Sequence, residues 1–167
     1  MLNDIDVKKA LARSVQTEKN AMNFYEIAAK QMKNTDAVKT FELLAREERE
    51  HARHFFDKYR GDDPLLPSFD EFINAAPDQE GEWLSDLDKT LLADFTDRKA
   101  MELAMQKEQR LEESLQEMAT KIEDPEVRAV FEENAKSTHN HYVLIESEYA
   151  RLMGMPHETD IDTFVRE

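Results

Sequence analysis

The chain has 167 residues, of which 40% are hydrophobic and 35% charged, a composition that suits one globular domain with a buried core rather than a disordered chain. It contains no cysteine, which excludes disulfides, thiolate nucleophiles, cysteine-ligated zinc and iron–sulfur clusters. The formal net charge of −15 argues against nucleic acid and anionic lipid as partners and is compatible with cations.

The sequence predicts an all-α protein, because three glycines and five prolines are too few for the turns of an all-β fold. Apolar residues recur at a period near 3.6 in four long segments, which we expect to be helices over about residues 4–33, 35–60, 88–122 and 125–153. Capping residues at Lys33–Asp36 predict the first break. Asp124 and Pro125 predict the start of the last helix, and Gly154 predicts its end.

Two further segments differ in composition from these helices. Residues 61–87 are rich in proline and acid and are expected to form a crossover with a short helix near Phe69–Asn74. Residues 155–167 are expected to form a polar C-terminal tail. Short turns predict two antiparallel helix hairpins, and the long crossover allows the second and third helices to run parallel.

No segment suits a membrane. No apolar run approaches the roughly 18 residues of a membrane span, and Met1–Ala10 lacks the pattern of a signal peptide. We therefore expect a soluble, cytoplasmic protein without a membrane partner.

The first hairpin is repeated in the second. A shift of 90 residues superposes the two without a gap. The matched pairs include Phe41 with Phe131, Glu18 with Glu108, and His51 with His141. A duplicated hairpin with a pseudo-two-fold axis can place paired groups at the centre of the molecule.

Polar residues interrupt the apolar stripe near the middle of each helix. They are Glu18 in the first helix, Glu48 and His51 in the second, Glu108 in the third, and Asn134, Thr138 and His141 in the fourth. A buried carboxylate is costly unless it is protonated, paired or bound to a cation. A Glu from each of two helices, with Glu-x-x-His from each of the others, is the ligand set of carboxylate-bridged di-iron and di-manganese bundles.

Taken singly, these residues have ordinary explanations. Glu48 and His51 can belong to a solvated helix face, Glu18 can form an ion pair, and His141 can be a hydrogen-bonded core histidine. The common stripe position and the repeat favour metal binding over these alternatives.

The runs Glu18–Tyr25, Phe41–His51 and Asp124–Phe131 resemble the rubrerythrin branch of the ferritin-like superfamily, and the resemblance covers about residues 5–153. It implies a ferritin-like four-helix bundle with a metal centre. By this resemblance the terminal carboxylates are Glu18 and Glu108, the bridging carboxylate is Glu48, and the imidazole ligands are His51 and His141.

The sequence departs from that family pattern at two positions. Thr138 stands where the second bridging Glu is expected, which leaves five ligands instead of six. Leu111 stands where peroxide-reducing rubrerythrins carry an extra Glu, and Glu112 is a candidate to compensate for it. The candidate residues that would support the ligands are Thr138, Tyr25, Asn134 and Glu112.

The resemblance implies two metal ions, with iron first and manganese or zinc as alternatives. It implies a non-haem di-iron oxidoreductase, of peroxidase or ferroxidase type, that acts on peroxide or O₂. The absence of cysteine means that electrons come from an external donor. A degenerate bundle that binds one metal or none, with a structural role, is the alternative, and an iron-storage cage is a third. Relatives of this type commonly form homodimers.

Overall fold

The computed structural model describes residues 1–60, 68–77 and 94–154. Within these ranges the chain is helical and has no strand. The helices are α1 (Asp4–Gln31), α2 (Thr35–Arg60), α3 (Phe69–Asn74), α5 (Asp97–Ala119) and α6 (Pro125–Leu152). None of the described helices is both long and apolar enough to cross a membrane.

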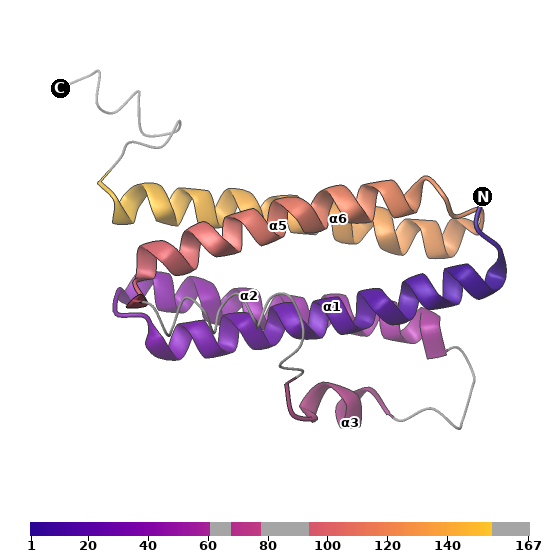
Figure 1. The fold of residues 1–167 in the computed structure, drawn as a ribbon, viewed down its shortest axis with the longest axis horizontal. Helices are drawn as coiled ribbons and strands as arrows, with labels where there is room; N and C mark the ends of the chain where they lie inside the picture. Colours follow the sequence, from indigo (N-terminus) through magenta and orange to yellow (C-terminus); the bar gives the residue numbers. More distant parts are fainter. Residues whose placement is uncertain (61–67, 78–93, 155–167) are drawn as a thin grey trace, which may run out of the picture.

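The long helices form two antiparallel hairpins that stack face to face. α1 packs along α2 and α5 packs along α6, and the main contact between the hairpins is between α2 and α6 (Figure 1). α2 and α5 run in the same direction (Figure 1), as the long connection between them allows. The predicted all-α bundle of two helix hairpins is therefore confirmed.

Side chains at the helix ends define the turn of the first hairpin. Asn34 caps α2, because its Oδ1 accepts a hydrogen bond from the Ala37 amide at 3.0 Å. The Asp97 carboxylate at the start of α5 accepts from the amides of Lys33, at 3.0 Å, and Asn34, at 2.7 Å. Asp97 thus fastens the α1–α2 turn of one hairpin to the first residue of the other.

The third long helix begins later than the sequence pattern placed it. We expected a start near Asp88, whereas α5 begins at Asp97, after Thr96 in an extended conformation. The Thr96 hydroxyl accepts from the Lys99 amide at 3.1 Å and so acts as the N-cap. Residues 88–93 lie outside the described residues, as do most of the expected crossover and the tail over 155–167.

The last helix begins at the predicted Pro125 and ends at Leu152, one residue before the predicted end at 153. The Asp124 carboxylate accepts from the amides of Glu126 and Val127, and Pro125 occupies the first turn. Gly154 follows the C-cap with φ of 68°, a left-handed conformation that glycine adopts without steric cost.

The core is continuous along the bundle and is closed at one side by α3. Phe55 and Phe131 meet edge to face between the hairpins, with ring centroids 4.9 Å apart. The short helix α3, found at Phe69–Asn74 as expected, packs Phe69 against Phe56 of α2. Lys19 of α1 donates a hydrogen bond to the Phe72 carbonyl at 2.8 Å, which holds α3 beside the middle of the bundle.

Candidate metal centre

The five predicted ligands converge in the middle of the bundle from four helices. They are Glu18 of α1, Glu48 and His51 of α2, Glu108 of α5, and His141 of α6. The three carboxylates are 0% exposed, and the two imidazoles are 5% and 2% exposed. The sequence pattern therefore identified buried positions, and the readings as a solvated helix face or a surface ion pair do not fit this burial.

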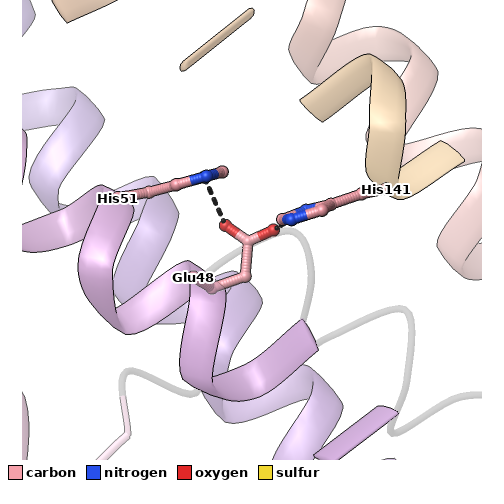
Figure 2. A group of neighbouring side chains, drawn as sticks. All are labelled: Glu48, His51 and His141. Atoms are coloured by element: carbon pink, nitrogen blue, oxygen red, sulfur yellow. Dashed lines mark hydrogen bonds and ion pairs between the residues drawn. The ribbon is translucent and has the colours of Figure 1, made fainter. Parts of the chain in front are cut away.

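Glu48 lies between the two imidazoles. Its Oε1 is 2.9 Å from His141 Nδ1, and its Oε2 is 3.3 Å from His51 Nδ1. Figure 2 shows one carboxylate oxygen turned toward each ring. Each of the three residues offers one ligand atom, and these atoms lie within 4.8 Å of one another. Glu48, for which the resemblance implies a bridging role, thus lies between the two imidazoles.

The remaining two carboxylates take equivalent places on either side. His51 Nδ1 is 3.5 Å from a Glu18 oxygen, and His141 Nδ1 is 3.7 Å from a Glu108 oxygen. The two imidazole rings stack with centroids 5.0 Å apart and planes only 6° from parallel. The 90-residue repeat thus corresponds to a pseudo-two-fold relation at the centre of the molecule.

The outer nitrogens of both histidines are also engaged. His51 Nε2 is 2.8 Å from the Ser137 hydroxyl, and His141 Nε2 is 3.3 Å from a Glu47 carboxylate oxygen. When Nε2–H donates to these oxygens, the lone pair of each Nδ1 faces the carboxylates, as a ligand nitrogen must. The sequence pattern assigned Glu47 to a solvated helix face and gave no role to Ser137. Both residues precede a site histidine by four positions, and the 90-residue shift matches one with the other.

The donor set fits metal ions, because many of its atoms form no hydrogen bond within the described residues. These atoms are both oxygens of Glu18, one oxygen each of Glu48 and Glu108, and His51 Nδ1. The contacts of His51 Nδ1 with Glu48 and Glu18, at 3.3 and 3.5 Å, are ion pairs. Buried polar atoms are rarely left unpaired, and three carboxylates together are unstable without counter-charge. Hard oxygen donors combined with imidazole suit iron, manganese or zinc.

Without a metal, the same crowding shifts the proton affinities of the cluster. Burial and the adjacent Glu48 raise the pKa of Glu18 to about 8. Burial opposes charge on the imidazoles, but the carboxylates outweigh it and raise the pKa of His51 to about 10 and that of His141 to about 11. The cluster therefore holds protons at neutral pH that cations would replace.

The candidate supporting residues make different contacts. The Tyr25 hydroxyl donates to a Glu108 oxygen at 2.6 Å and fixes that carboxylate. Asn134 donates to the Val130 carbonyl of its own helix, and Thr138 is 0% exposed with no hydrogen-bond partner among the described residues. Glu112 instead pairs with the exposed His139 at 2.8 Å. Its contacts therefore do not support the expectation that Glu112 replaces the extra Glu that is absent at Leu111.

An all-α bundle with carboxylates and imidazoles buried at its centre is typical of ferritin-like metal-binding proteins. A family model described as rubrerythrin matches residues 9–149, and the chain belongs to that family. Comparison with curated proteins and with solved structures gave no significant match.

Proposed function

We propose that the chain is a non-haem di-iron oxidoreductase of rubrerythrin type that acts on peroxide or O₂. The observation that carries the proposal is the position of Glu48, with one oxygen toward each of two stacked histidines (Figure 2). A carboxylate in this place could hold two cations, and the flanking Glu18 and Glu108, which lie beside His51 and His141, would each add one further carboxylate to the site.

The protein's own residues would bind, orient and shield the centre. His51 and His141 would bind through Nδ1, since their Nε2 atoms are held by Ser137 and Glu47. Tyr25 would orient Glu108, and the full burial of the carboxylates would keep bulk water out. When bound, iron supplies the one-electron steps that peroxide or O₂ reduction requires.

An external reductant is part of this proposal, because the chain has no cysteine and therefore no cysteine-ligated iron group of its own. We also propose that the protein acts in the cytoplasm as a homodimer. Manganese or zinc in place of iron would leave the ligand assignments unchanged.

Anaerobic titration of the full chain with Fe(II), followed by oxidation and Mössbauer spectroscopy, tests the proposal. We expect two iron ions per chain and a spin-coupled di-ferric spectrum, together with turnover of peroxide by a supplied reductant. Uncoupled ferric iron, or the absence of bound iron, would reject a di-iron enzyme.

Thr138 favours a second candidate function, a bundle that binds one metal or none and serves a structural role. Its buried side chain has no carboxylate where the repeat places a mate for Glu48. Elemental analysis separates the two candidates: about one metal ion per chain or less, unchanged by added iron, would support the structural role.

A further inference from the structure

We propose that the metal centre takes a small exogenous carboxylate, of the size of formate, as a bridging ligand beside Thr138. The inference rests on the proposed two-metal centre and adds a ligand class to it. Two features support it: α6 has Thr138 where the repeat would place a second carboxylate, and the buried carboxylates do not balance the charge of two divalent ions.

Thr138 occupies the position on α6 that Glu48 occupies on α2. The 90-residue shift matches the two residues, and each precedes a site histidine by three positions, on the same face of its helix. The carboxylate of Glu48 reaches both imidazoles (Figure 2). The pseudo-two-fold relation therefore places Thr138 across the stacked rings, where a second carboxylate would close the centre.

The hydroxyl of Thr138 is available to hold such a ligand. The side chain is 0% exposed, and its Oγ1 has no hydrogen-bond partner among the described residues. A buried hydroxyl without a partner costs free energy, and donation to a carboxylate oxygen would remove that cost. Glu18 Oε1 and one oxygen of Glu108 likewise form no hydrogen bond among the described residues, which suits a site that is completed by groups from outside the chain.

Charge counting favours an anion over a neutral ligand. Two divalent cations bring four positive charges, and the buried carboxylates Glu18, Glu48 and Glu108 bring three negative ones. The protein ligands therefore leave one positive charge unbalanced in a region shielded from water. A monoanionic carboxylate supplies that charge and has the same two-oxygen geometry as the side chain that the repeat lacks.

Calorimetric titration of the metal-free full chain with Mn²⁺ tests the proposal without any turnover. In carboxylate-free buffer we expect the second ion to bind more weakly than the first. Formate should tighten the second ion by about tenfold or more, as a group that completes a metal site does. The same concentration of chloride, the control for ionic strength and for a generic anion, should have little effect.

Two variants of Thr138 distinguish the contribution of its hydroxyl to formate binding from the contribution of its shape. Thr138→Val keeps the shape and removes the donor, so the ratio of the second-ion affinities with and without formate should be smaller than in the wild type. Thr138→Glu supplies the carboxylate from the chain, so both ions should bind tightly and formate should no longer matter. If Thr138→Glu does not fold, as judged by circular dichroism, the comparison between the wild type and Thr138→Val still decides.

The results distinguish this inference from the proposed function. Two ions that bind equally tightly with and without formate, or an equal effect of chloride, would overturn the carboxylate site and leave the two-metal centre intact. One ion or none under every condition, in the wild type and in Thr138→Glu, would overturn both.

Discussion

Glu48 holds the central position in the cluster through its two short contacts to His51 and His141. Replacing it by glutamine keeps the size of the side chain and removes the negative charge that both cations would share. We expect Glu48→Gln to reduce bound metal to about one ion per chain or less, because the remaining ligands no longer compensate a second cation. Metal analysis after dialysis measures this.

The matched control for that change is Glu50→Gln. Glu50 lies on the same helix, is exposed and makes no contact with the cluster that the structure records. It should leave the metal content unchanged. Equal metal content in Glu48→Gln and the wild type would remove Glu48 from the ligand set.

The two histidines differ in what holds their outer nitrogen, and this difference predicts unequal metal positions. His141 faces the Glu47 carboxylate, and His51 faces the Ser137 hydroxyl. A carboxylate partner makes an imidazole more basic than a hydroxyl does. We expect Glu47→Gln to weaken metal binding at the His141 position by about 10- to 100-fold, and Ser137→Ala to weaken the His51 position less. Stepwise binding constants from calorimetry measure both.

Equal losses of metal affinity in Glu47→Gln and Ser137→Ala would mean that the contacts at Nε2 position the imidazole rings and do not change their basicity. Glu42→Gln provides the control, because Glu42 is exposed on the same helix. It should bind metal as the wild type does.

Most of the cluster was predictable from the sequence, because a charged residue in an apolar stripe is visible without coordinates. Glu18 and Glu108 were identified in this way, and both are fully buried. The partner of Glu112 was not predictable, because a residue one turn from Glu108 can face the centre or the neighbouring helix. Its pairing with His139 depends on how α5 and α6 are rotated against each other.

At the scale of helices, the Asp97 carboxylate is the clearest link between the ends of the two hairpins. It accepts from the amides of Lys33 and Asn34, which the α1–α2 turn would otherwise leave unbonded. We expect Asp97→Ala to lower the free energy of unfolding by about 1–3 kcal/mol, the usual cost of removing a charged acceptor. Urea denaturation of the metal-free protein measures this change.

Asp94→Ala is the control for that variant. Asp94 is exposed, and within the described residues its carboxylate forms a long ion pair with Lys99 at 3.8 Å, so removal of this carboxylate should change stability by less than about 1 kcal/mol. A similar loss in both variants would show that the turn does not depend on Asp97.

Helix ends were predicted well where a proline or glycine accompanies the capping residue and poorly at the start of α5, where it does not. Asp124 with Pro125 located the start of α6, whereas α5 begins at Thr96–Asp97, a start with neither proline nor glycine.

The repeat extends beyond the core. Every residue that lines a hollow between α1 and α2 has its match, 90 positions later, in a hollow between α5 and α6. Such agreement supports duplication of the whole hairpin.

For the whole molecule, the proton affinities of the cluster predict how stability depends on pH. The pKa values of His51 and His141 rise from 6.5 to about 10 and about 11, and that of Glu18 rises from 4.5 to about 8. The folded state therefore binds more protons than the unfolded state above neutral pH. The stability that these groups contribute is lost as pH rises through their folded pKa values.

We expect the melting temperature of the metal-free protein to fall by several degrees between about pH 7 and pH 9.5. Saturating Mn²⁺ should reverse the trend, since the metal replaces the protons and binds better as they leave. Differential scanning calorimetry measures both curves. Glu18→Gln should flatten the metal-free curve, and a metal-free melting temperature that rises over this range would contradict the assigned proton affinities.

The pseudo-two-fold axis between the stacked histidines has a consequence for the origin of the centre. Two copies of residues 4–60 related by that axis would present Glu18, Glu48 and His51 twice, which makes six ligands from a single hairpin sequence. An ancestor of half the length could thus have assembled the complete centre by self-association. Fusion of the halves would free the second copy to diverge. A difference on one side alone, such as Thr138 at the position matched to Glu48, is open to a fused chain and closed to a strictly symmetric pair.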